Sequence, residues 1–309
     1  MSTGGLVLLL VTVVTAATPL IYAAVGELVV ERSGVLNLGV EGMMLAGAVT
    51  AFAVTLTTGS GTLGVAAGAL AGAAMGLVFG ALTLSLLANQ VATGLALTIF
   101  GIGLSALVGA GFVGTPVPRL PRLDLPVLSD LPVAGPLLFG HDALVYLAIL
   151  ITAAVAWFLS SSRAGLVLRA VGENHEAAHV IGYPVIGIRY LAVLFGGAMS
   201  GLGGAYLSLA YTPMWAEEMT AGRGWIALAL VVFAAWRPWR VLIGAWLFGG
   251  VTILQLHAQG SGLFHLPSQL LSMLPYLATI LVLVLISAGP WRGWQGAPAC
   301  LGKPFHPTA

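Results

Sequence analysis

Charged residues are scarce in this sequence. Lys, Arg, Asp and Glu make up 7% of the 309 residues, whereas they make up roughly a quarter of an ordinary soluble domain. This scarcity excludes a soluble enzyme, and a hydrophobic share of 59% excludes a disordered chain. Eleven basic and ten acidic residues leave a net charge of +1. A nucleic-acid binder is therefore also excluded, because such proteins turn a basic face toward phosphates.

Cysteine and lysine each occur once. Cys300 lies in a tail rich in Pro and Gly, so it can neither form an intrachain disulfide nor complete a thiolate metal site. Lys303 lies in GKP and not in GxxxxGK[ST], so the chain lacks the phosphate-binding loop of an ATPase. No Lys or Arg precedes Arg32, so the positive segment of a cleaved signal peptide is missing and Leu6–Gly26 is expected to be a membrane span.

Long hydrophobic runs are what the sequence has instead. A helix needs roughly 20 apolar residues to cross about 30 Å of hydrocarbon, so uninterrupted runs mark the spans. We predict an all-α, polytopic integral membrane protein of about nine transmembrane helices, with eight or ten left open. The expected spans are 5–26, 37–57, 62–88, 91–113, 142–160, 189–211, 224–236, 241–257 and 268–288. The 224–236 run is short for a crossing, and glycines between Leu36 and Gly47 could break the second span into half-helices.

Glycine is unusually frequent. Its 42 residues are close to twice the usual share of about 7%. Glycines recur at every fourth position in the third span and again in the sixth, at Gly68, Gly72, Gly76, Gly80, Gly197 and Gly201. Such stripes let neighbouring helices approach closely in lipid, so we expect glycine-rich helix packing.

The basic residues predict an orientation. Alternate loops hold eight and three Lys and Arg residues, and the richer set belongs in the cytoplasm. We therefore treat 1–289 as one transmembrane domain with its N-terminus outside, an extracellular proline-rich loop at 114–141 and a cytoplasmic loop at 161–188. Residues 290–309 form a cytoplasmic tail. The prolines of 114–141 argue against a helix there and leave either an ordered cap over a pathway or a bare spacer.

Intramembrane charges are also missing. No Asp, Glu, Lys or Arg falls near the middle of a predicted span, and Glu41, near the start of the second, is the deepest. Proton- and sodium-driven transporters need such groups for coupling, and ion channels usually show rings of charge or a carbonyl filter. If this protein moves a solute uphill, the energy must come from an ATPase on a separate chain.

One enzymatic pattern competes with transport. His175, Glu176 and His179 form HEAAH, a literal HExxH, which on a helix can bind zinc with the glutamate as base. The motif lies in a charged loop and not in a span, and no third ligand is evident. We therefore expect no metal and read the segment as a short amphipathic helix, with Ala177, Ala178 and Ile181 on one face. An intramembrane zinc metalloprotease remains the alternative.

Several segments carry a family resemblance. They are RAGLVLRAVGENHEAAHVIGYPVIGIRY (163–190), GELVVERSGVLNLGVEGMMLAGA (26–48), NQVATGLAL (89–97), MTAGRGWIALA (219–229) and LPSQLLSMLPYLATILVLV (266–284). Together they resemble the permeases of bacterial ABC importers of the branched-chain amino acid, simple sugar and nucleoside superfamily. The 26–48 segment resembles the nucleoside branch in particular. One departure is VVFAAWRPWR (231–240), where the family usually has a glycine-containing turn.

The resemblance implies a permease subunit of the bacterial plasma (inner) membrane. Its implied partners are a second permease, so that the pair is a heterodimer, a cytoplasmic ABC ATPase that binds the ATP, and an external substrate-binding lipoprotein. The chain itself would bind no cofactor and no nucleic acid. The solute would be a nucleoside, with sugars second and branched-chain amino acids third, moved by alternating access. An ATP-independent facilitator is the other alternative.

Two sets of residues are the candidate sites. The resemblance makes the exposed helix of the 161–188 loop the contact with the ATPase, through Glu173, Asn174, His175, Glu176, Ala177, Ala178, Ile181 and Gly182. Polar groups near the starts of two glycine-rich spans are candidates for the solute pathway: Asn37, Glu41, Asn89, Gln90 and Thr93. Because an unsatisfied polar group in lipid is costly, these must face protein or water. Structural hydrogen bonding remains open for Asn37 and Glu41, and Glu31 with Arg32 is expected to form an interfacial pair.

Overall fold

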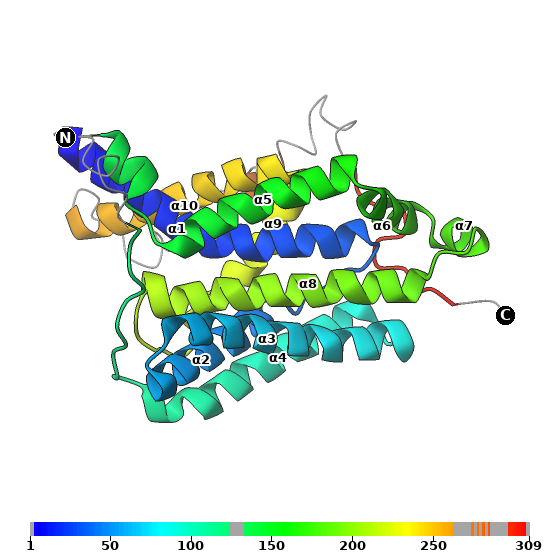
Figure 1. Cartoon of the computed structure of the whole chain (residues 1–309), viewed down its shortest axis with the longest axis horizontal. Helices are drawn as coiled ribbons and strands as arrows, with labels where there is room; N and C mark the ends of the chain where they lie inside the picture. The colour runs from blue at the N-terminus through cyan, green and yellow to red at the C-terminus, as the bar shows by residue number, and fades with distance from the viewer. Residues whose placement is uncertain are drawn as a thin grey trace.

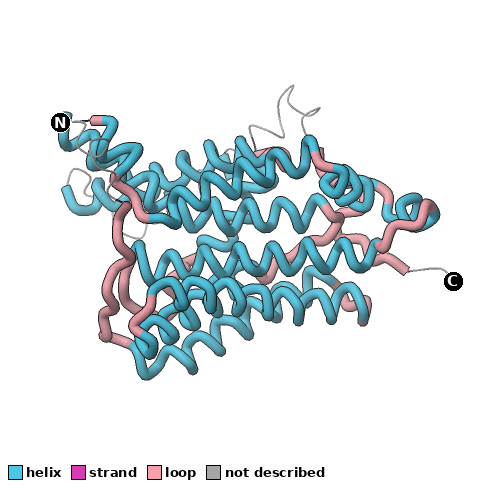
Figure 2. The backbone as a smooth tube through the Cα atoms, viewed as in Figure 1, coloured by secondary structure: helices cyan, strands magenta, loops and turns pink. Residues whose placement is uncertain are grey.

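The computed structural model describes residues 3–123, 133–261 and 296–306, with isolated positions between 273 and 284. In these ranges the regular secondary structure is helical and extended pairing is limited to isolated bridges (Figure 2). The long apolar helices are α1 (Thr3–Arg32), α2 (Val40–Thr58), α3 (Gly61–Gly80), α4 (Gln90–Gly109), α5 (Ala143–Ser161), α8 (Val185–Tyr206) and α10 (Pro238–Ser261). The shorter ones are α6 (Arg163–Glu173), α7 (His175–Val180) and α9 (Arg223–Phe233). The predicted all-α polytopic membrane protein is confirmed, with 7 helices in the described ranges that are long and apolar enough to cross a membrane.

The helix bounds correct the predicted spans. The first span continues to Arg32 and the sixth begins at Val185, because charged residues in both are buried inside the bundle. The second span is one helix from Val40, so its glycines do not break it, and residues 33–39 form a loop before it. One-turn π-helices extend α3 over Ala81–Ser85 and α8 over Leu207–Tyr211, and a 3-10 turn extends α4 over Ala110–Phe112. The predicted span 268–288 lies almost entirely outside the described residues.

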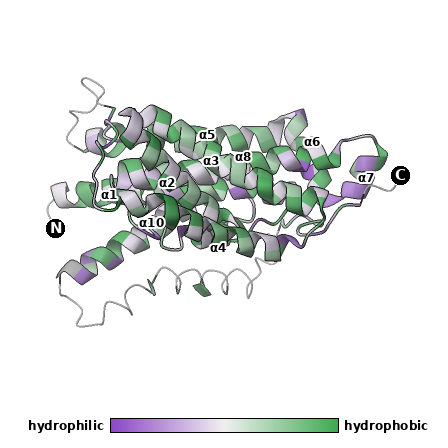
Figure 3. Cartoon of the chain, turned by 90° about the horizontal axis from the view of Figure 1, so that it is seen from below, coloured by the Kyte–Doolittle hydropathy of each residue, from purple (hydrophilic) through white to green (hydrophobic). Residues whose placement is uncertain are grey.

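The long helices run along the long axis of the molecule. The N-terminus lies at one end, and α7 and the C-terminus lie at the other, which we call the α7 end (Figure 1). Apolar residues cover most of the helical surface, while hydrophilic residues are prominent at α7 (Figure 3). This distribution is expected for a bundle whose middle faces lipid and whose ends face water.

Glycine contacts join α3, α8 and α2. A Cβ added at Gly72 of α3 would lie 2.7 Å from the Cα of Gly201 of α8 and against the carbonyl of Gly197. A Cβ at Gly47 of α2 would lie 2.5 Å from the same Gly201 Cα. The predicted glycine-rich packing is thereby confirmed, since a larger residue at these positions would push the helices apart.

A short helix, α9, follows a segment without regular secondary structure. α9 has 11 residues, about 16 Å at 1.5 Å per residue, which is half of the hydrocarbon thickness. Residues 212–222 precede it without regular helix, and Trp215 in this segment is buried against Gly109. α9 begins beside Glu41 of α2. The run predicted as a short span is therefore a half-helix inside the bundle.

The turn from α9 into α10 accounts for the departure from the family pattern. Ala235 and Trp236 have φ of 49° and 55°, a conformation that glycine adopts without strain. The Trp236 indole donates to Glu31 Oε2 at 2.5 Å, and Arg32 donates to the Trp236 carbonyl. These contacts hold a left-handed turn without glycine.

The described part of the proline-rich loop is ordered at the end opposite α7. The Val117 amide donates to the Pro213 carbonyl, the Leu120 amide to Leu209, and Arg119 Nε to Ala210 at 2.7 Å. The segment thus covers the end of α8 as a cap. The expectation of no helix in 114–141 is wrong for Gly135–Phe139, which forms a single π-helical turn.

Candidate functional site

The segment between α5 and α8 folds into two capped helices. The Ser162 hydroxyl accepts from the Gly165 amide at 2.9 Å and caps α6, and Asn174 Oδ1 accepts from the Ala177 amide at 2.9 Å and caps α7. Gly182, at φ 93°, ends α7, and the Tyr183 amide donates back to the Ala178 carbonyl. Local sequence therefore fixes both ends of α7.

The predicted coupling residues divide between two faces of α7. Six are exposed at its surface or flanks: Glu173, Asn174, Glu176, Ala177, Ile181 and Gly182. His175 and Ala178 are buried against the rest of the protein. The expectation that Ala177, Ala178 and Ile181 share one face is wrong, because Ala178 points inward while Ile181 remains 71% exposed. Val180, which the sequence analysis missed, is 84% exposed and extends the apolar tip.

Arg189 of α8 holds the inner face of α7. Its guanidinium donates to His175 Nδ1 at 3.0 Å, to the Ser33 carbonyl at 3.1 Å and to the Lys303 carbonyl at 3.3 Å. Its side chain is 1% exposed. One buried cation thus joins α7, α8, the loop after α1 and the C-terminal tail, and hydrogen bonds offset the cost of burying its charge.

The C-terminal tail lies along this junction. The Cys300 amide donates to the Gly172 carbonyl at 2.9 Å, and the Gly302 amide donates to the Gly34 carbonyl at 3.1 Å. Phe305 is buried, with its ring centroid 5.2 Å from that of His175 and 5.3 Å from that of His179. Residues 296–306, read from the sequence only as a tail, are a strap across α6 and α7.

Both histidines of the HEAAH motif take part in this junction. His175 Nδ1 faces the Arg189 guanidinium, whose charge opposes a nearby metal cation, and both rings pack against Phe305. Among the residues that the structure describes, no group of three His, Cys, Asp or Glu side chains could hold a metal ion. Burial, followed by the charge of Arg189, lowers the pKa of His175 below its ordinary value of 6.5.

Glu41 binds the start of the half-helix α9. Its Oε1 accepts from the Thr220 hydroxyl at 2.5 Å and from the Gly222 amide at 2.9 Å, while Oε2 accepts from the Gly224 amide at 2.5 Å. A carboxylate is favoured there because the first amides of a helix lack partners and carry its positive dipole end. The geometry gives Glu41 a structural role.

Asn37 and Gln90 support the loop between α1 and α2. Asn37 Oδ1 accepts from the Gly39 amide at 2.9 Å, and Gln90 Oε1 accepts from the Leu36 amide at 2.8 Å. Glu27 Oε1 accepts from the Asn37 amide at 3.1 Å. All three side chains are buried. Their oxygens pair backbone amides of the 33–39 loop, which have no helical partner.

Asn89 and Thr93 lie apart from this cluster on the surface of α4. Asn89 is exposed and caps α4 by accepting from the Ala92 amide at 3.0 Å. Thr93 is half-buried in a groove of about 490 Å³ between α3 and α4, which Leu82 and Phe100 also line. The structure therefore separates the five pathway candidates into three buried and two accessible residues.

The burial of two acidic residues in α1 was not predicted from the sequence. Glu27 and Glu31 lie within α1 and are 1% and 2% exposed, so acidic side chains extend deeper into the first span than predicted. Their four-residue spacing places them on one helix face and was the available signal. Glu31 and Arg32 do not pair with each other as expected, because each binds Trp236 through a different group.

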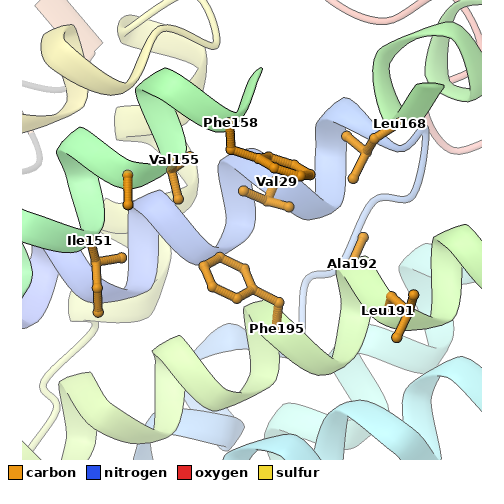
Figure 4. Close-up of a pocket in the computed structure, with 9 residues that line it drawn as sticks. Val29, Ile151, Val155, Phe158, Leu168, Leu191, Ala192 and Phe195 are labelled. Atoms are coloured by element: carbon orange, nitrogen blue, oxygen red, sulfur yellow. The ribbon is translucent and has the colours of Figure 1, made fainter. Parts of the chain in front are cut away.

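An apolar cleft of about 360 Å³ lies between α1, α5, α6 and α8 (Figure 4). Phe158 of α5 and Phe195 of α8 project into it, with Val29 of α1 between them (Figure 4). Its lining is aliphatic and aromatic throughout. A polar solute would find no hydrogen-bond partner in such a cleft, so it is not the candidate site.

The fold and these sites define a multi-pass α-helical membrane protein. A family model described as the permease component of branched-chain amino acid transport systems matches residues 9–286. The chain belongs to this family of ABC transporter permeases, as its sequence segments predicted.

Curated relatives match nearly the whole chain. TsgC13 of Haloferax volcanii, which bears the name of a glucose ABC transporter permease protein, is 45% identical over 89% of this chain and 90% of its own. The nucleoside ABC transporter permease protein NupC of Lactococcus lactis is 33% identical over 87% and 89%. The guanosine ABC transporter permease protein NupQ of Bacillus subtilis is 31% identical over 94% and 93%. No solved structure matches the chain.

Proposed function

We propose that this chain is the membrane subunit of an ATP-driven importer of the plasma membrane that moves a small polar solute by alternating access. A nucleoside is the first candidate solute, because NupC and NupQ bear the names of nucleoside and guanosine permeases. A sugar is the second, because the relative at 45% identity bears the name of a glucose permease. The partners in this proposal are a cytoplasmic ATPase, a second permease subunit and an external binding lipoprotein.

The exposed apolar tip of α7 carries the proposal. Val180 and Ile181 project from a short helix whose other face is held by Arg189 and Phe305. A helix so placed suits docking in a groove of a soluble partner. The ATPase would move α7, and Arg189 would pass that movement to the loop after α1, where Glu27 and Asn37 meet.

The α7 end faces the cytoplasm in this proposal. Eight of the 11 basic residues belong to the segments that the sequence assigns to the cytoplasmic side, and those of them that the structure describes lie in α6, in helix ends and turns, or in the tail at that end, which supports the orientation by the positive-inside rule. Of the five pathway candidates, Asn89 and Thr93 keep accessible groups and would face the solute. Asn37, Glu41 and Gln90 would hold the walls in place.

The test is uptake by proteoliposomes that hold this chain with its second permease and ATPase. Val180→Asp with Ile181→Asp places charge on the tip without disturbing a buried contact, and uptake of labelled guanosine and glucose should fall to background. Thr58→Asp is the matched control. Thr58 is exposed at the C-terminal end of α2, away from α7, and its substitution should leave uptake unchanged. Full uptake by the tip variant, or equal flux without the ATPase, would contradict the proposal.

A further inference from the structure

A basic pocket lies at the α7 end, on the side of α5 away from the apolar cleft. It has a cavity volume of about 680 Å³, is open to the surface, and is bordered by the ends of α1 and α5, by α6 and by the turn from α9 into α10. Arg32, Arg169 and Arg237 line it, and no acidic side chain does so in the part of the chain that the structure describes. The proposed transport function leaves this pocket unused.

The positive charges of the three arginines are not balanced by any acidic side chain in the described lining of the pocket. Arg32 is committed to the backbone, since it donates to the Trp236 carbonyl at 3.0 Å and to the Gly296 carbonyl at 3.1 Å. The charges of Arg169 and Arg237 oppose that of Arg32, and Glu173 offsets them in part. Arg169 Nε is buried and has no hydrogen-bond acceptor among the described residues. The pocket therefore offers guanidinium donors that suit an anion with strong acceptor oxygens.

Apart from Ser160, the remaining walls are indoles and apolar side chains. Trp157 of α5 and Trp239 of α10 are 65% and 52% exposed, at the ends of helices that cross the membrane. Indoles at such positions sit at the level of lipid head groups. Ala153 and Ala156 have small side chains, so the pocket continues along α5 from the arginines toward the middle of the helix. The pocket thus combines positive charge at the membrane interface with an apolar surface that suits hydrocarbon.

We propose that this pocket binds the phosphate of an anionic phospholipid, held by Arg169 and Arg237, with an acyl chain against Trp157 and the alanines of α5. Basic pockets between membrane helices at the cytoplasmic surface favour anionic head groups in this way. A free phosphate shares the charge chemistry but makes no use of the exposed indoles. The bound lipid would link α6, which leads into α7, to the turn after α9.

The test measures lipid affinity of the full-length chain in phosphatidylcholine nanodiscs. Fluorescent phosphatidylglycerol and phosphatidylcholine with the same acyl chains are titrated separately, and phosphatidylglycerol should bind preferentially. Arg169→Gln with Arg237→Gln should weaken that binding by about 25-fold, because each arginine near an anionic surface contributes roughly fivefold. Arg163→Gln, exposed on the same helix and outside the pocket, is the matched control.

Each outcome decides the proposal. Equal affinity for the two lipids, or full affinity in the double variant, overturns it. Displacement of the lipid by millimolar inorganic phosphate assigns the pocket to a soluble anion and also overturns the lipid assignment. Should the double variant fail to fold, the comparison of lipids and the phosphate competition on the wild-type chain still decide. Because no transport is measured, the result is independent of the proposed function.

Discussion

Arg189 donates a hydrogen bond to His175 Nδ1 at 3.0 Å, with both side chains buried between α7 and α8. Because a guanidinium only donates, Nδ1 must be the acceptor, and the neutral ring carries its proton on Nε2. The same guanidinium holds the Ser33 and Lys303 carbonyls. A short surface helix is thereby attached to the membrane bundle through one cation.

Removing this cation should free α7. Arg189→Gln takes away the charge and the reach to three acceptors, and we expect about 3 kcal/mol of destabilisation, since hydrogen bonds from charged groups contribute about 1.5–3 kcal/mol each. Amide protection in α7 should fall while that in α3 is retained. Arg163→Gln, an exposed arginine on α6, is the control. Unchanged protection of α7 in Arg189→Gln would remove the clamp role.

Acidification should release α7 in a similar way. The pKa of His175 is lowered by burial and then by Arg189 and Lys303, and Glu176 opposes this shift in part. The folded state therefore favours the neutral ring, so the stability from this contact is complete above the ordinary pKa of 6.5 and is lost as pH falls through the lowered pKa. α7 amide protection factors, measured between about pH 7.5 and about pH 5, should decline.

His175→Gln is the control for this pH dependence. The glutamine carbonyl can accept from Arg189 but does not titrate, so the α7 protection factors should become nearly independent of pH. A wild-type profile that stays flat, or a variant that keeps the wild-type decline, would show that another group is responsible.

The tail should also stabilise α7. Phe305→Ala removes a buried ring that contacts both histidines of the motif, and we expect a loss of about 3 kcal/mol, typical of such truncations. Residues 296–306 should become accessible to limited proteolysis. His306→Ala, exposed at the next position, should neither lower the stability nor expose the tail to proteolysis. Protease resistance in Phe305→Ala equal to the wild type would mean that the strap is held by its backbone bonds alone.

The helices could be predicted from the sequence, but the polar contacts buried between them could not. Residues 175–180 were predictable as an exposed helix from their caps and position, yet the inward turn of His175 depends on Arg189, which lies on another helix, and on Phe305, which lies far along the chain. The first predicted span stopped before Glu27 because charge is costly in lipid. The buried carboxylate of Glu31 accepts from Trp236, which lies 205 residues away in the sequence. Such partners are set by tertiary packing, which local pattern does not encode.

Glu41 should be essential to the half-helix α9. In Glu41→Gln an amide NH₂ would replace one carboxylate oxygen and face a backbone donor, either the Gly224 amide or the Gly222 amide. We expect a loss of about 2–4 kcal/mol, because a buried donor loses its acceptor and the charge at the helix start is removed. Asn89→Ala, which removes an exposed cap, should cost only about 1 kcal/mol. Equal unfolding midpoints for the two variants would contradict this ranking.

The turn after α9 offers a substitution that should stabilise the protein. Ala235 has φ of 49°, which costs an L residue roughly 1–2 kcal/mol relative to glycine. Its side chain is buried, so Ala235→Gly also loses up to about 0.8 kcal/mol of methyl burial, and the difference between the two terms is a net gain of about 0.2–1.2 kcal/mol. Ala234→Gly, next to it at φ −71°, relieves no strain and should destabilise by about 1 kcal/mol. Opposite shifts of the unfolding midpoint are therefore expected, and a loss of stability in both variants would mean that the Trp236 contacts, not the backbone conformation, set the energy of this turn.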